Sequence, residues 1–131
     1  MSHRSGSIGV LCNGLASIKH PFLSSLLGGI ESSFDLDKYI IEVVPCSLIA
    51  LADSPSKAIS FVTEQRKLEG LFVLSPVPEK WLKGLLDKKF PVISLNVDYT
   101  NLPITSVIIN SDNMYKTSLE YLLKLGHRKI W

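Results

Sequence analysis

The feature that most constrains this chain is an alternation between short apolar runs and longer segments with helical spacing of apolar residues. The runs are rich in β-branched residues and bounded by Gly, Pro or Asn, which is typical of buried strands. Near-continuous apolar strands favour a parallel sheet covered by helices on both faces. The predicted strands are 7–12, 39–46, 70–76, 91–97 and 106–110, and the predicted helices are 21–34, 54–68, 78–89 and 111–126.

Right-handed crossovers between such strands produce a doubly wound, three-layer α/β/α fold with a mainly parallel sheet. One connection fits this pattern poorly. Only eight residues, 98–105, separate the fourth and fifth strands, which is short for a parallel crossover. The fifth strand is therefore the least regular element of the prediction.

Capping residues mark the ends of the predicted helices. Ser54 is a candidate N-cap for helix 54–68, in which Leu68 is expected to face inward. Asn110 or Ser111 caps the last helix, and Gly126 ends it. The pair Gly28-Gly29 weakens helix 21–34 and predicts that another part of the chain approaches it closely.

Length and composition restrict the class of protein. A chain of 131 residues holds one core, and 46% hydrophobic with 20% charged residues indicates a soluble globular domain. The net charge is only +2, and the basic residues are scattered along the sequence. They do not form the dense basic cluster that would bind a nucleic-acid backbone. No apolar run is long enough for a membrane span or a secretory signal, so no membrane partner is expected. Residues 1–6 resemble a tag remnant or a disordered terminus and are left out of the fold.

The two cysteines, Cys12 and Cys46, each end an apolar run. We expect buried thiols in a reducing compartment, with a disulfide or a functional thiol as the alternatives.

Motifs for catalysis, metals and cofactors are missing from the sequence. No Cys or His spacing suggests a zinc site, and no glycine-rich phosphate loop follows the first strand. A catalytic set could combine Ser75 and His20 with Asp98 or Asp112, but nothing fixes their mutual geometry. The chain is therefore expected to be no enzyme and to hold neither a metal nor a cofactor.

Polar side chains gather at the carboxyl ends of the predicted strands, where ligands bind in such sheets. Amides, hydroxyls and one apolar ring suit a small polyhydroxylated or heterocyclic ligand. An ordinary structural role remains open, namely helix capping for Asn110 and Asp112 and core packing for Phe22. The residues at this edge are Asn13, Phe22, Ser75, Asn96, Asn110 and Asp112.

Read in order, several segments resemble the regulatory domain of LacI/GalR-type bacterial transcription repressors. These segments are "IGVL", "PF", "GIE", "EGLFVLSP", "PVISLN", "SVIIN" and "LGHRKI". The resemblance covers the chain from Ser7 to its end, and "EYLLKLGHRKI" is its most specific part.

The resemblance implies a periplasmic-binding-protein-like subdomain with strand order 2-1-3-4-5. Residues 7–131 would be the first segment of the N-terminal subdomain of a two-lobed effector-binding domain, whose second lobe and preceding helix-turn-helix are absent from this chain. Ile130 and Trp131 would begin a strand that crosses to the second lobe. It further implies a cytoplasmic homodimeric repressor that senses a sugar-like effector and contacts DNA only through the absent helix-turn-helix.

Carried over by position, the resemblance nominates the start of the first helix and the ends of several strands. Asn96 and Asn110 stand where many members have Asp, and the loop over 13–19 is longer than usual. The predicted ligand-binding residues are Asn13, His20, Pro21, Phe22, Ser75, Pro76, Asn96, Asn110 and Asp112.

Two other functions fit the same pattern. The chain could be half of a solute-binding protein or receptor sensor domain for sugar transport or chemosensing. It could also be a free-standing flavodoxin-like enzyme or signalling domain.

Overall fold

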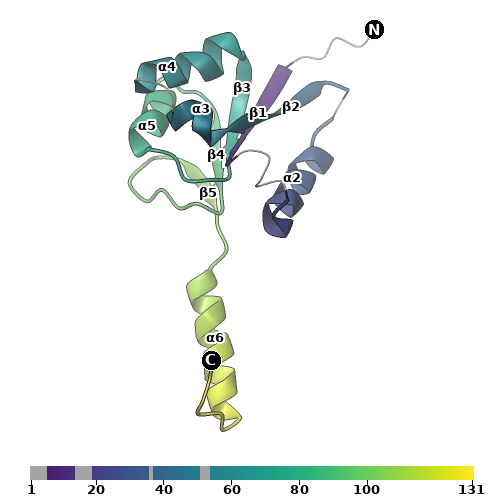
Figure 1. The fold of residues 1–131 in the computed structure, drawn as a ribbon, viewed down its shortest axis with the longest axis vertical. Helices are drawn as coiled ribbons and strands as arrows, with labels where there is room; N and C mark the ends of the chain where they lie inside the picture. Colours follow the sequence, from purple (N-terminus) through teal and green to yellow (C-terminus); the bar gives the residue numbers. More distant parts are fainter. Residues whose placement is uncertain (1–5, 14–18, 36, 51–53) are drawn as a thin grey trace.

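A parallel sheet forms the centre of the computed structural model, which describes residues 6–13, 19–35, 37–50 and 54–131 (Figure 1). Within these residues the sheet has five strands in the order β2-β1-β3-β4-β5, and every neighbouring pair is parallel. The predicted fold class and strand order are therefore confirmed. The strands are β1 (Gly6–Cys12), β2 (Tyr39–Pro45), β3 (Leu68–Val73), β4 (Val92–Leu95) and β5 (Thr105–Val107).

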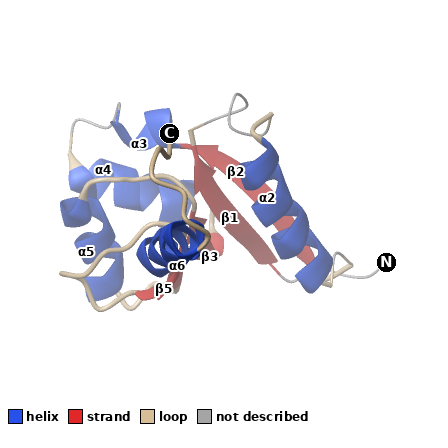
Figure 2. Cartoon of the chain, turned by 90° about the horizontal axis from the view of Figure 1, so that it is seen from below, coloured by secondary structure: helices blue, strands red, loops and turns tan. Residues whose placement is uncertain are grey.

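Helices cover the sheet from both sides (Figure 2). One face carries α2 (Pro21–Ser33). The other carries α3 (Cys46–Ala50), α4 (Pro55–Ser60), which continues as the π-helical turn η1 (Phe61–Gln65), and α5 (Glu79–Asp87). None of the helices in the described residues is long and apolar enough to cross a membrane.

The larger core lies between the sheet and the layer of α4 and α5. Trp81, Leu82 and Leu85 of α5 are buried there against strand residues of the sheet. Gly84 lets the two helices pack closely, because a Cβ atom at this position would overlap the Ile59 side chain. A smaller cluster, which includes Val10, joins the opposite face to α2.

Two sequence predictions about helices are wrong. Helix 54–68 ends at Gln65, because Lys67 takes a left-handed φ of 52° and Leu68 already begins β3. A left-handed residue stops a helix, since it turns the backbone out of the helical path. Nothing lies within 4 Å of a Cβ placed on Gly28 or Gly29, so no segment approaches α2 closely at that pair.

The fifth strand is parallel despite its short connection. β5 covers Thr105–Val107 rather than 106–110, and it pairs with β4 from Ile93↔Thr105 to Leu95↔Val107. The connection contains no helix, and the Tyr99 side chain within it is buried as part of the larger core. A loop that packs its own side chains thus replaces the usual crossover helix.

The last helix, α6 (Ser111–Lys124), leaves the carboxyl end of β5 and projects away from the sheet (Figure 1). None of its residues is buried. Gly126 follows it with a φ of 90°, as predicted for the residue that ends the helix. Arg128 Nη1 donates to the carbonyl oxygen of Leu123 at 3.1 Å, near the negative pole of the helix.

The last residues of the chain form no strand in this structure. Ile130 and Trp131 have irregular backbone and are exposed, so the crossing strand that they are predicted to begin stays a prediction for the longer protein. A strand needs a neighbour to accept its backbone hydrogen bonds, and no described strand lies beside these two residues.

Candidate functional site

The carboxyl ends of β1, β2 and β3 lie side by side because the three strands are adjacent and parallel. The residues that follow them surround an open hollow of about 430 Å³. Its lining combines apolar and polar residues, which suits a ligand with both kinds of surface. The lining residues are Asn13, Cys46, Ser47, Ile49, Pro76, Val77 and Pro78.

Ser75 lies beneath this hollow and ties the three strand ends together. Its side chain is only 3% exposed. The Ser75 hydroxyl oxygen accepts the backbone N–H of Asn13 at 3.2 Å, and the same hydroxyl is hydrogen-bonded to the Cys46 thiol. Ser75, two residues beyond the end of β3, therefore joins the residue that follows β1 to the residue that follows β2.

The Cys46 thiol is held in its protonated form. Partial burial raises the pKa of Cys46 to about 11, with a further increase from Cys12 nearby, while the hydrogen bond from Ser75 opposes the shift. A protonated thiol is a weak nucleophile at neutral pH, so this site is unsuited to thiolate chemistry. Neither Cys12 nor Cys46 is in a disulfide; Cys12 is buried as predicted, whereas Cys46 is half-buried.

Tyr99 anchors the wall of the hollow formed by Val77. The backbone N–H of Val77 donates to the Tyr99 hydroxyl oxygen at 3.0 Å. Burial raises the pKa of Tyr99, and the hydrogen bond from Val77 opposes that increase. The connection between β4 and β5 is thereby attached to the segment that follows β3.

The ends of β4 and β5 hold the predicted amides. Asn96 has a left-handed φ of 67°, and its backbone N–H donates to the carbonyl oxygen of Val107 at 2.8 Å. Asn is among the residues that tolerate this conformation best. Asn110 is the N-cap of α6, since its side-chain oxygen accepts the backbone N–H of Asn113 at 3.2 Å. Asp112 is exposed in the first turn of the same helix.

The start of α2 holds the three remaining nominated residues. His20 is exposed at the N-cap position and makes no side-chain capping bond. Pro21 occupies the first helical turn, and Phe22 is half-buried. Residues 14–18 of the first loop, which the sequence predicts to be longer than usual, lie outside the described residues.

The structure thus brings Asn13, Ser75 and Pro76 together at one hollow. The other nominated residues stand at the ends of β4 and β5 and at the start of α2. Sequence reasoning did not nominate Cys46 and Ser47 as site residues, although the end of the run 39–46 and the residue after it would have indicated them. It also missed Tyr99, for which no sequence signal was available. No cluster of metal-ligating side chains occurs in the described parts of the chain.

Comparison with known proteins finds similarity in structure alone. No family model matches the sequence, and no curated protein does. The transcription regulator CcpA of Lactococcus lactis superimposes with a TM-score of 0.74 at 17% identity, over 96% of this chain and 45% of that one. A LacI family transcriptional regulator from Lactobacillus casei, solved with bound sucrose, gives 0.70 at 24% identity, over 95% and 44%.

A third similar structure is the LacI family regulator CCPA from Weissella paramesenteroides with bound glucose. Its TM-score is 0.70 at 20% identity, over 92% of this chain and 43% of that one. The chain therefore spans less than half the length of each of these structures. Over nearly its whole described length, the chain has the fold found in LacI-family transcription regulators.

Proposed function

We propose that this chain is the first α/β segment of the effector-sensing domain of a bacterial transcription regulator, and that residues 7–131 form most of one lobe. The observation that carries the proposal is the match of the 2-1-3-4-5 sheet to LacI-family regulators, two of them solved with sugars bound. The hollow at the carboxyl ends of β1, β2 and β3 supports it independently.

The ligand of this site is a sugar or a similar polyhydroxylated molecule. Asn13 and Ser47 are exposed beside the hollow and offer neutral donors and acceptors to hydroxyl groups. Pro76 and Val77 offer an apolar surface to the flat side of a sugar ring. Ser75 acts indirectly, because its hydroxyl holds Asn13 and Cys46 in place.

The polar groups at the carboxyl ends of the strands suit ligand sensing better than catalysis. The Cys46 thiol is protonated at neutral pH, and the hydroxyl of Ser75 is buried in structural hydrogen bonds. Asn110, at the end of β5, caps α6 with its side chain. The nominated polar groups therefore bind and position rather than react.

A second lobe, a helix-turn-helix and a dimer complete the proposal for the full-length protein. A ligand pocket normally buries most of its ligand's surface, and an open hollow on one lobe cannot do so. We therefore expect the 131-residue chain alone to bind sugars only weakly. Micromolar binding by this chain in calorimetry would contradict the two-lobed proposal.

Calorimetry on the protein expressed from its complete reading frame tests the site directly. A panel of mono- and disaccharides should contain a ligand, and Asn13→Ala should weaken its binding by about tenfold, the value of roughly one lost hydrogen bond. Asn101→Ala, in an exposed turn after Tyr99, is the matched control and should change nothing. Tight binding that is indifferent to Asn13→Ala would place the ligand elsewhere.

A further inference from the structure

One face of the sheet is only partly covered by α2. Phe72 of β3 packs toward α2, and it pairs with Ile93 of β4, which in turn pairs with Thr105 of β5. Because paired residues share a face and strand side chains alternate, Val107 of β5 lies on this face as well. Ile93 is 37% exposed and Val107 is 60% exposed, so α2 does not reach this part of the sheet. We call Phe72, Ile93 and Val107 the open sheet face.

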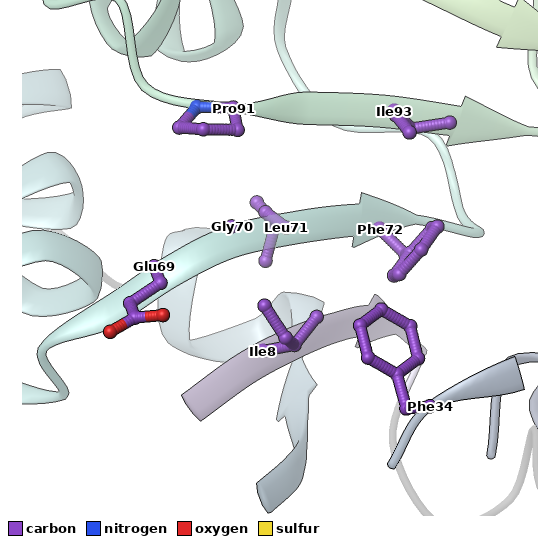
Figure 3. Close-up of a pocket in the computed structure, with 8 residues that line it drawn as sticks. All are labelled: Ile8, Phe34, Glu69, Gly70, Leu71, Phe72, Pro91 and Ile93. Carbon is purple, nitrogen blue, oxygen red and sulfur yellow. The ribbon is translucent and has the colours of Figure 1, made fainter. Parts of the chain in front are cut away.

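The open sheet face continues into an apolar groove of about 180 Å³ (Figure 3). Ile8, Phe72 and Ile93 line the groove from three neighbouring strands, and Phe34 lies at one side of it. Gly70 also lines the groove and adds no side chain that would fill it. A surface of this kind accepts a ridge of apolar side chains.

The last helix, α6, carries such a ridge. Tyr115, Leu119 and Leu122 fall on one side of the helix at spacings of four and three residues. We call these three residues the α6 stripe. Lys116 and Glu120 lie toward the opposite side, where their side chains approach to 4.0 Å. An amphipathic helix of 14 residues with no buried residue is marginal in water unless its stripe is covered.

The other helices show where this chain places a helix after a strand. β1, β2 and β3 are each followed by helices that pack on the sheet from which the chain has just left. A short connection does not prevent this, since β2 passes into α3 with no residue between them. The connection between β5 and α6, residues 108–110, is therefore long enough for α6 to return to its own sheet.

The sheet has room for α6 on the side that carries α2. On the opposite side, the larger core is already covered by α4, α5 and the connection that holds Tyr99. A helix of 14 residues spans about 21 Å, and a strand of six residues such as β3 spans about 20 Å. An α6 that returned from the carboxyl end of β5 would therefore run along the open sheet face over its full length.

The covalent connection favours the chain's own sheet over the sheet of a second copy. A short linker holds two surfaces of one chain at an effective concentration in the millimolar range. At micromolar chain concentration, contact within one chain is therefore favoured over the same contact between two chains by about a thousandfold.

We propose that α6 is a strap that closes over its own sheet, so that the α6 stripe covers the open sheet face. The structure holds the open position, in which α6 projects beyond the carboxyl ends of the strands (Figure 1). Closure changes the backbone dihedral angles of residues 108–110, as a hinge of a few residues does in other proteins. It requires no ligand, so it holds or fails independently of the proposed function.

Hydrogen exchange on the 131-residue chain tests closure directly, at concentrations where sedimentation velocity shows a monomer. A solvated helix of 14 residues frays, so the amides of an open α6 should exchange within about tenfold of their unfolded rates. The amides of a closed α6 should exchange at least about a hundredfold more slowly than unfolded. Unprotected α6 amides in the monomer, or protection that appears only in a dimer, would overturn the proposal.

Variants identify the two surfaces that meet. Leu119→Lys in the α6 stripe and Ile93→Lys in the open sheet face should each speed α6 exchange by about tenfold or more, because a buried charge opposes closure. Val107→Lys, at a position that is 60% exposed in the open position, replaces Ile93→Lys if the latter does not fold. Protected β1 amides show that the sheet of each variant is intact.

Thr117→Lys, on the polar side of α6, is the matched control and should leave α6 exchange unchanged. If Leu119→Lys exposes the α6 amides while neither sheet variant does, α6 is covered by another surface and the proposal fails.

Small-angle scattering gives an independent measure of the same closure. A compact chain of 131 residues has a radius of gyration of about 14 Å. The unmodified monomer should approach this value, and Leu119→Lys should raise it. A monomer that is several ångströms larger and does not respond to Leu119→Lys would contradict closure.

Discussion

At the scale of single residues, Ser75 is the side chain on which the candidate site depends most. Its buried hydroxyl joins the ends of three strands through Asn13 and Cys46. We predict that Ser75→Ala lowers the free energy of unfolding by about 1–3 kcal/mol, because the Asn13 N–H and the Cys46 thiol lose their hydrogen bonds to the buried Ser75 hydroxyl. Urea denaturation measures this, and exposed Ser47→Ala is the control with little effect. An unchanged midpoint for Ser75→Ala would refute this role.

Cys46 gives the fold a dependence on alkaline pH. Its pKa rises from 9.0 to about 11 on folding, so the folded state holds the proton more tightly than the unfolded chain does. The resulting stability is present below 9.0 and is lost as the pH rises through about 11. We predict that urea midpoints fall across this window and fall less in Cys46→Ser. Burial also raises the pKa of Tyr99 above its ordinary value, so the difference between the two proteins is what isolates the contribution of Cys46.

Individual site residues show what the sequence could and could not predict. Asn13 and Ser75 follow apolar strands directly, so their place at one edge was predictable from strand alternation. Tyr99 was not, because a loop residue's contact with Val77 depends on how a nine-residue connection folds. Asn110 carries both a cap signal and a ligand signal, and the structure shows the cap.

At the scale of elements, α5 contributes three of the most deeply buried side chains of the described residues to the larger core. Trp81, Leu82 and Leu85 are almost fully buried between it and the sheet. We predict that Leu82→Ala lowers the free energy of unfolding by about 2–5 kcal/mol, because it removes apolar contacts and leaves a cavity. Lys83→Ala, one residue along and exposed, should change it by less than about 0.5 kcal/mol. Equal effects in chemical denaturation would contradict this packing.

Element boundaries were harder to predict than element types. Strands and helices alternate as the apolar periodicity indicates, but Lys67 ends a helix through a left-handed backbone that Lys rarely adopts. The two glycines in α2 predicted that another segment packs closely against the helix, and none does. A glycine pair can also stand on an exposed helix surface, so it does not by itself indicate a contact. Local propensity therefore indicated where elements exist, while tertiary packing decided where they end.

At the scale of the whole molecule, the doubly wound order was predictable from the resemblance, but the position of α6 was not. The sequence gives α6 an apolar stripe, which normally indicates a helix packed on its own sheet. The structure instead leaves every residue of α6 unburied. Periodicity shows that a helix has an apolar side, but it does not show which surface that side packs against.

The central proposal is that this chain forms most of one lobe of a two-lobed, sugar-sensing transcription regulator. Sequencing the complete transcript around these 131 codons tests it most directly. The proposal predicts a helix-turn-helix encoded before Ser7 and a second α/β subdomain encoded after Trp131. An export signal before Ser7 would instead favour a solute-binding protein. A stop codon directly after Trp131, with no helix-turn-helix upstream, would contradict the proposal.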